Sequence, residues 1–239
     1  MKVSIFVTCL VEHLYPEVGM ATVRILESLG LEVDFNPNQT CCGQPAYNSG
    51  YPEEAARVGR NLLAVFSGSD YIVTPSGSCA AMIKVFLPKL LVSSPEEAVA
   101  SKRMASRTYE LTDFLSTVLR TDSTGASFPH IVTYHDSCHL LRELGIKEQP
   151  RRLIGGVTDI DFREMDHPDL CCGFGGLFSV KFDELSAVMG IQKLRAIEKT
   201  GAEYVVANDV SCLMHLDGLI RREKASLKTL HMAELLAEF

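Results

Sequence analysis

The chain has 239 residues, of which 46% are hydrophobic and 22% charged, and its net charge is −7. This composition is ordinary for a globular protein and supplies a core that needs no disulfide staples. An acidic chain without a concentrated basic face argues against nucleic acid as the main partner. The apolar run over 1–11 is too short to span a membrane and is not followed by a cleavage site, so we expect a cytoplasmic protein without a membrane span.

The first half of the chain predicts strands that alternate with helices. An apolar run over 3–8 predicts a buried strand, and the next helix is expected to begin at Pro16 and stop at Gly30. A short strand is predicted over 32–35. The further predicted elements of this half are a helix over 53–66, a strand over 71–74 and a helix after Cys79.

The second half repeats this order. Its predicted elements are a strand over 131–134, a helical segment, a helix with Leu185, Val188, Ile191 and Leu194 on its apolar face, and a strand over 204–207. We therefore predict an α/β fold of two similar Rossmann-like halves, each with a parallel sheet. The polar stretch 121–127 separates the halves, which predicts two domains, 1–121 and 128–239.

All eight cysteines belong to one repeated pattern, which consists of a single cysteine, a vicinal Cys-Cys-Gly and a last cysteine. The first copy is Cys9, Cys41, Cys42 and Cys79, and the second copy is Cys138, Cys171, Cys172 and Cys212. Equivalent cysteines lie about 130 residues apart, and the sequences that precede the last cysteine of each copy are also alike. The pattern indicates an internal duplication.

The cysteines are expected to meet at the carboxyl ends of the strands. Each single cysteine follows a predicted strand, and the vicinal pairs lie in loops that can reach the same edge of the sheet, where open α/β sheets bind ligands. Each half would then gather four thiols in one place. In a reducing compartment such thiols favour metal binding or catalysis over disulfides.

Four thiolates complete a tetrahedral zinc site or bind an iron–sulfur cluster. Neither half has the two C-x-x-C knuckles of a zinc ribbon, and the side chains of adjacent cysteines diverge, which favours a cluster of several metal atoms. We expect one or two [4Fe–4S] clusters per chain, with backbone N–H groups beside Gly43 and Gly173 free to donate to sulfur. Zinc in at least one half, a vicinal disulfide switch and a purely packing role of the thiols stay open as alternatives.

Three histidines lie near the cysteines in the sequence. His135 and His139 flank Cys138 and are weak candidates for a catalytic, proton-handling role, and the alternative is a capped helix with exposed histidines. His215 follows Cys212 by three residues, so one helical face would carry both, which makes His215 a candidate for an extra metal ligand.

The motif resembles that of the cysteine-rich CCG domain family. It has 31 residues between Cys9 and Cys41 and 35 between Gly43 and Cys79, followed by its second copy. Members of this family include a component of heterodisulfide reductase and the iron–sulfur subunits of glycolate oxidase. The two-copy chain without a ferredoxin domain is most similar to the members that act in lactate utilization. Further matching stretches are 39–50, 74–79, 107–115 and 171–176.

The resemblance implies an iron–sulfur electron-transfer subunit of a multi-protein system that oxidises L-lactate to pyruvate. Its activity would require partner subunits of the lactate utilization system, including a ferredoxin-type iron–sulfur protein. In the wider family the motif ends in C-x-x-C and five cysteines hold a noncubane cluster, whereas Met82 and His215 stand in place of the last cysteine here. The alternatives are a zinc-stabilised scaffold without a redox role and a thiol/disulfide redox protein similar to heterodisulfide reductase.

Overall fold

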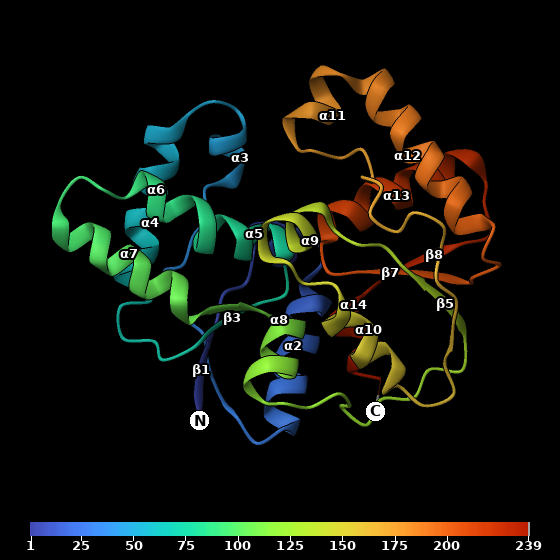
Figure 1. The fold of residues 1–239 in the computed structure, drawn as a ribbon, viewed down its shortest axis with the longest axis horizontal. Helices are drawn as coiled ribbons and strands as arrows, with labels where there is room; N and C mark the ends of the chain where they lie inside the picture. Colours follow the sequence, from blue (N-terminus) through green and yellow to red (C-terminus); the bar gives the residue numbers. More distant parts are fainter. Residues whose placement is uncertain (239) are drawn as a thin grey trace.

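The computed structural model describes residues 1–238 and contains two parallel sheets of four strands each (Figure 1). The strands are β1 (Lys2–Ile5), β2 (Glu32–Asp34), β3 (Ile72–Thr74), β4 (Thr108–Glu110), β5 (Ile131–Tyr134), β6 (Asp161–Phe162), β7 (Tyr204–Ala207) and β8 (Lys228–His231). The strand order is β2-β1-β3-β4 in the first sheet and β6-β5-β7-β8 in the second. The two sheets share one topology, which confirms the predicted α/β fold with two similar halves.

Helices cover both sheets (Figure 1). They are α1 (Cys9–Leu14), α2 (Pro16–Ser28), α3 (Gln44–Asn48), α4 (Pro52–Val65), α5 (Gly77–Ala81), α6 (Leu87–Leu90), α7 (Pro95–Arg107), α8 (Leu111–Asp113), α9 (Cys138–Leu144), α10 (Glu148–Gly155), α11 (Leu177–Lys181), α12 (Asp183–Glu198), α13 (Val210–Glu223) and α14 (Met232–Leu236), with π-helical segments at Met82–Phe86 and Phe114–Val118. Within residues 1–238, no helix is both long enough and apolar enough to cross a membrane.

Most predicted elements are found, with shifted ends. The strands predicted over 131–134 and 204–207 are β5 and β7 residue for residue. Strand β1 ends at Ile5, before the predicted end, because Thr8 caps the next helix with its Oγ1, which accepts from the Val11 N–H at 3.3 Å. Helix α5 starts before Cys79 and so carries this cysteine in its first turn.

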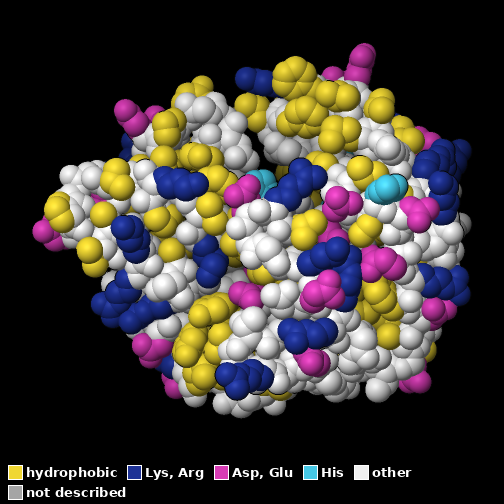
Figure 2. All heavy atoms as spheres, viewed as in Figure 1, with side chains coloured by type: hydrophobic (Ala, Val, Ile, Leu, Met, Phe, Trp, Pro, Cys, Tyr) yellow, Lys and Arg dark blue, Asp and Glu magenta, His cyan; other side chains and the backbone are white. Residues whose placement is uncertain are grey.

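The apolar face predicted for α12 is confirmed only at its C-terminal end, where Leu194 is fully buried and Ile191 packs against the core. Leu185 and Val188 are 53% and 62% exposed, while Lys193 is fully buried on the same helix. The Lys193 ammonium donates to the carbonyl oxygens of His167 and Pro168 at 3.1 and 3.0 Å, so the helix turns a charged side chain inward to hold the loop before the second vicinal pair. Figure 2 shows apolar side chains gathered on the surface over α11 and α12.

The largest hydrophobic core joins the two halves. Val18 and Ile25 of α2 are buried in one cluster with Leu235 and Leu236 of α14, the last helix of the chain. In the sequence, one sheet precedes the stretch 121–127 and the other follows it. The largest hydrophobic core nevertheless contains residues from both halves. The division into domains 1–121 and 128–239 stays a prediction.

Candidate metal centres

The four cysteines of the first half lie together in the structure. Cys9 begins α1 after β1, Cys41 and Cys42 lie in the loop before α3, and Cys79 lies in α5 after β3. The Sγ atoms of Cys9 and Cys41 are 3.9 Å apart, and those of Cys42 and Cys79 are 3.4 Å apart. Cys41 and Cys42 also interact through their thiols. We call these four residues the first thiol row.

The second half repeats this arrangement from equivalent elements. Cys138 begins α9 after β5, Cys171 and Cys172 lie in the loop before α11, and Cys212 lies in α13 after β7. Cys138 interacts with Cys171, and Cys172 interacts with Cys212. These four residues form the second thiol row. All eight cysteines are free, and each predicted set of four is brought together at the carboxyl edge of its own sheet.

Glycine is required after each vicinal pair. Gly43 and Gly173 have φ angles of +89° and +93°, in the left-handed region. Their backbone N–H groups donate to the Sγ atoms of Cys41 and Cys171, each at 3.4 Å. A Cβ atom on Gly173 would lie 2.4 Å from the carbonyl oxygen of Ser186. The glycine therefore lets α12 approach closely and turns an N–H toward the sulfur.

Negative charge is favoured on the first cysteine of each vicinal pair and, in the second row, also on Cys212, whose pKa is lowered to about 6 by hydrogen bonds with Cys172 and His135. Hydrogen bonds from Cys42 and from the single cysteine beside it lower the pKa of Cys41 to about 3. Hydrogen bonds from the single cysteine beside it and from Cys172 lower the pKa of Cys171 to about 2. The pKa values of Cys42 and Cys172 are raised, because both thiols donate to their thiolate neighbours and are buried. Thiolates are the form of cysteine that binds metals.

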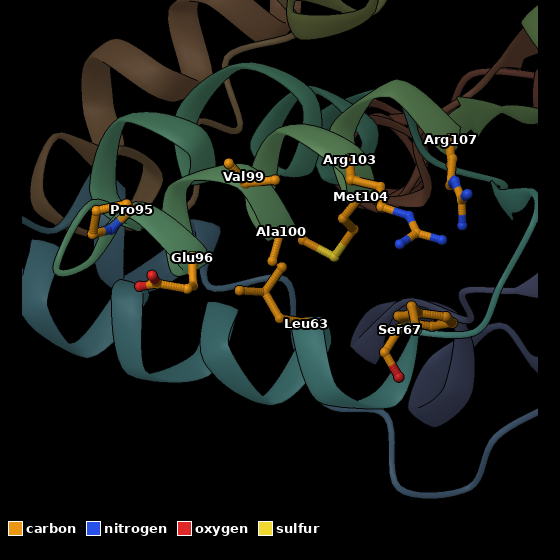
Figure 3. Close-up of a pocket in the computed structure, with 10 residues that line it drawn as sticks. Leu63, Ser67, Pro95, Glu96, Val99, Ala100, Arg103, Met104 and Arg107 are labelled. Carbon is orange, nitrogen blue, oxygen red and sulfur yellow. The ribbon is translucent and has the colours of Figure 1, made fainter.

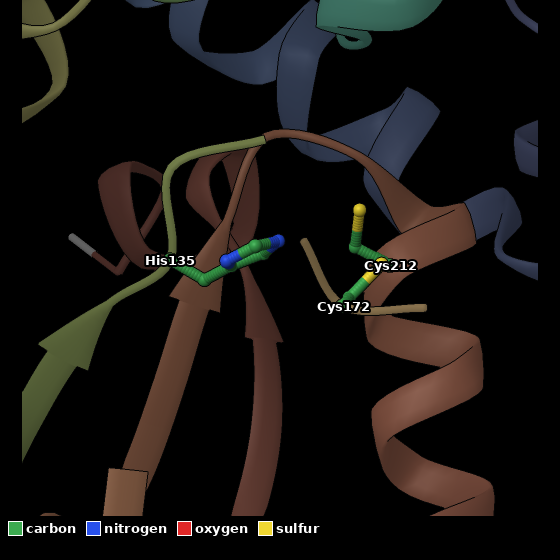
Figure 4. Close-up of side chains that lie close together, drawn as sticks. All are labelled: His135, Cys172 and Cys212. Atoms are coloured by element: carbon green, nitrogen blue, oxygen red, sulfur yellow. The ribbon is translucent and has the colours of Figure 1, made fainter. Parts of the chain in front are cut away.

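His135 and His139 both contact the second thiol row, and His215 is not part of it. His135 is fully buried, so the expectation of exposed histidines is wrong for it. Its ring, Cys172 and Cys212 form a group whose donor atoms all lie within 4.8 Å of one another (Figure 4). Nδ1 of His139 lies 3.6 Å from Cys138 Sγ. His215 packs beside Phe174, with 6.2 Å between ring centroids.

An aspartate that sequence reasoning missed links the two halves. Asp209 is 2% exposed, and its carboxylate accepts from Ser76 Oγ at 2.6 Å and from the N–H and Oγ of Ser78 at 3.1 and 2.8 Å. It thereby holds the first turn of α5, the helix that carries Cys79, from the opposite half. The sequence repeat could have pointed to Asp209, because Asp209 and Ser76 occupy equivalent positions in the two halves. Each is the N-cap of the helix that carries the last cysteine of its half.

One cavity lies away from both thiol rows. It measures about 470 Å³ and lies in the first half between α4 and α7 (Figure 3). Val99 and Met104 contribute apolar surface to it, and Arg103 and Arg107 lie along its side. No cysteine lines this cavity, so the candidate centres are the thiol rows and not the cavity.

Fold and thiol rows together define a duplicated cysteine-rich protein. The profile of the cysteine-rich CCG domain matches residues 3–84 and 132–217. Lactate utilization protein A of Geobacillus thermodenitrificans is 48% identical over 236 residues, which cover 99% of this chain and 98% of that protein. The Bacillus subtilis protein of the same name is 44% identical over 99% of both chains. The chain therefore belongs to the CCG cysteine-rich family and, within it, to the family of lactate utilization protein A.

The fold is also found in a solved structure of low sequence identity. A hypothetical protein from Helicobacter pylori aligns with a TM-score of 0.67 and 10% identity. The alignment covers 97% of this chain and 47% of that longer chain. This likeness concerns the fold alone.

Proposed function

We propose that this chain is an iron–sulfur electron-transfer subunit of a cytoplasmic multi-protein system that oxidises L-lactate to pyruvate. The observation that carries the proposal is the pairing of the sulfurs in each thiol row. Cys41 pairs with Cys9 and Cys42 with Cys79, so the two vicinal cysteines belong to different pairs. The family relationship to proteins named for lactate utilization supports the choice of substrate.

The donor sets fit a cluster of more than one metal atom. Two thiolates that share a metal atom at about 2.3 Å lie about 3.8 Å apart at a tetrahedral angle. The separations within the two pairs of the first row, 3.9 and 3.4 Å, are close to this value. A single zinc ion would need all four sulfurs at such distances. Within residues 1–238, no three cysteines of one row have all their Sγ atoms within 4.8 Å of one another. Two pairs of sulfurs therefore favour more than one metal atom over mononuclear zinc, and we propose [4Fe–4S] as the cluster because the chain resembles the iron–sulfur subunits of the CCG family.

The chain's own residues hold the cluster and tune its surroundings. The four cysteines of each thiol row would be its ligands, and the cluster would supply one-electron transfer when bound. Gly43 and Gly173 donate N–H groups to one sulfur of each row, which stabilises negative charge there. Cys42 and Cys172 are each only 2% exposed, so the inner side of each row is shielded from water.

Lactate oxidation removes two electrons and two protons from one carbon–oxygen unit, and a one-electron group does not do this unaided. We therefore assign substrate oxidation to the assembled system and electron transfer to this chain, with a ferredoxin-type iron–sulfur protein among the partners. The exposed apolar side chains of α11 and α12, which include Val180, Leu185 and Val188, lie within sixteen residues after Cys172. We place the partner contact on this surface, because electrons have to leave near a thiol row.

Metal analysis tests the proposal directly. After anaerobic reconstitution we expect about four iron and four sulfide per occupied thiol row, a brown colour and an EPR signal on reduction. Stoichiometric zinc without acid-labile sulfide would instead make the chain a scaffold. Retention of activity after chelation, with loss on thiol alkylation, would support the thiol/disulfide alternative.

Activity tests the assignment to a subunit. L-Lactate-dependent reduction of an artificial acceptor is measured with the reconstituted chain alone and then with its partner proteins added. We expect negligible turnover by the chain alone and turnover with the partners. Full turnover by the chain alone would make it the dehydrogenase itself.

A further inference from the structure

One buried position makes the two thiol rows unequal. Phe6 and His135 each follow the first strand of their sheet and lie three residues before the single cysteine. Their backbone N–H groups make equivalent bonds, Phe6 to the carbonyl of Val73 at 2.8 Å and His135 to that of Val206 at 2.9 Å. Both side chains are fully buried. The first half therefore has a hydrocarbon ring where the second has an imidazole.

The two rings have different partners. Phe6 packs edge-on against Phe66, with 5.9 Å between ring centroids, as an ordinary core residue does. The Nδ1 and Nε2 atoms of His135 are both buried and are not paired with any oxygen or nitrogen of the described residues, and the ring interacts instead with the Cys212 thiol. An imidazole always has a donor or acceptor at each nitrogen, and leaving both unpaired in the interior is unfavourable. The apolar ring of the first half shows that packing alone does not require a histidine here.

The imidazole points at the second thiol row. His135 extends from the end of β5 toward Cys172 and Cys212, and its donor atom and their two Sγ atoms lie within 4.8 Å of one another (Figure 4). Imidazole nitrogen and thiolate sulfur both bind iron and zinc. His215 also has a buried Nε2 without a partner among the described residues, but it is not part of this group.

We infer that His135 is a metal ligand of the second site, beside Cys172 and Cys212. The second site then has mixed sulfur and nitrogen ligation, whereas the first is held by thiolates alone. This inference rests on the proposed function, since it requires a cluster in the second row. It replaces the role in proton handling that the sequence suggested for His135, because a nitrogen bound to metal does not carry a proton.

Pulsed EPR of the reduced, reconstituted full chain tests the inference. The chain contains seven histidines, so protein labelled with [¹⁵N]histidine is compared with unlabelled protein. We expect a nitrogen hyperfine coupling of the size of a direct metal–nitrogen bond, which changes on labelling. His135→Phe, which copies the first half, is expected to lose the coupling. His139→Phe and His215→Leu are matched controls that are expected to keep it.

The outcomes separate this inference from the proposed function. An iron–sulfur signal without a directly bound nitrogen overturns the ligand role of His135 and leaves the electron-transfer proposal intact. A weak coupling accompanied by an exchangeable deuteron in D₂O also overturns it, since this indicates a hydrogen bond to sulfur. Absence of iron and sulfide overturns both. The labelling measurement on the unsubstituted chain decides the matter even if His135→Phe does not fold.

Discussion

At the scale of single residues, the vicinal cysteines determine how the four sulfurs of each row come together. Sγ of Cys41 lies 3.9 Å from that of Cys9 and Sγ of Cys42 lies 3.4 Å from that of Cys79, while the two vicinal thiols also hydrogen-bond to each other. A single cysteine between the same loops would serve only one pair. The vicinal arrangement is therefore the feature that lets two loops and two helix starts bring four sulfurs into one row.

Replacing one cysteine is expected to affect one site only. Cys42→Ser removes a sulfur from the first thiol row and should lower bound iron and sulfide to about half of that in the unsubstituted chain, because the second row keeps its own ligands. The matched variant is Cys172→Ser, which should spare the first row. Metal analysis and EPR after anaerobic reconstitution provide the measurement. If either variant abolished all signals while circular dichroism stayed native, one shared site would be the better description.

Glu110 is expected to make stability depend on pH. It is buried at the end of β4, where its carboxylate accepts from the Thr112 N–H and from Asn208 Nδ2, each at 2.8 Å. Burial raises its pKa from 4.5 to about 7. The native state therefore binds a proton that the unfolded state has already released between these values, so the free energy of unfolding falls as pH rises toward 7 and levels off above it.

The expected loss is about 3 kcal/mol, and Glu110→Gln should remove most of it because the amide does not ionise. Urea unfolding between pH 5 and 8 measures the effect. Glu53→Gln, at an exposed position on α4, is the control and should follow the unsubstituted chain. A Glu110→Gln variant with an unchanged pH profile would show that Glu110 stays ionised in the folded chain.

At the scale of elements, the contact between α5 and α9 brings the two halves together. Gly77 starts α5, and a Cβ atom there would lie 2.6 Å from the Cβ of Leu140 in α9. Gly77→Ala is therefore expected to force the helices apart and to cost about 1–3 kcal/mol of unfolding free energy. Gly218→Ala, in α13 with no atom within 4 Å, is the control and should be neutral or stabilising. Denaturant unfolding that shows no difference between the two variants would contradict this account.

The exposed face of α12 is expected to contact the partner. Val188→Glu puts a charge on this face, and we expect about a tenfold higher partner concentration to be needed for half-maximal lactate oxidation. Val99→Glu, on α7 and 68% exposed, is the matched control. Equal effects of the two substitutions would show that the partner does not bind at the exposed face of α12. Metal content should stay unchanged in both variants.

Some of these elements could be predicted from the sequence and others could not. The duplicated cysteines and the strands over 131–134 and 204–207 could be predicted, because spacing and β-branched runs are local signals. The exposure of Leu185 and Val188 on α12 could not be predicted, since the loop carbonyls that accept from Lys193 help to decide which side of the helix is buried. The burial of His135 was equally invisible, because it is set by packing against segments distant in sequence. The ligand roles of the cysteines and the domain boundaries stay predictions.

At the scale of the whole molecule, the shared core should make the chain unfold as one unit. Leu235 of α14 is fully buried in the same cluster as α2. Leu235→Ala is expected to cost about 2–5 kcal/mol and to lower the stability of both halves equally. Thiol labelling during denaturant unfolding, read by mass spectrometry, reports Cys9 and Cys138 separately. Two distinct midpoints would show that the halves are independent domains.

The contact between α14 and α2 also has a consequence for the order of synthesis. In a chain of separate domains, the N-terminal domain commonly folds while the rest is still being made. Here the apolar face of α2 is complete once residue 28 has been added, but the helix that covers it is Met232–Leu236, near the end of the chain. The first half therefore reaches its final packing only after residues 232–236 have been synthesised. Metal that needs the final packing of the first half would then be delivered after that point in translation.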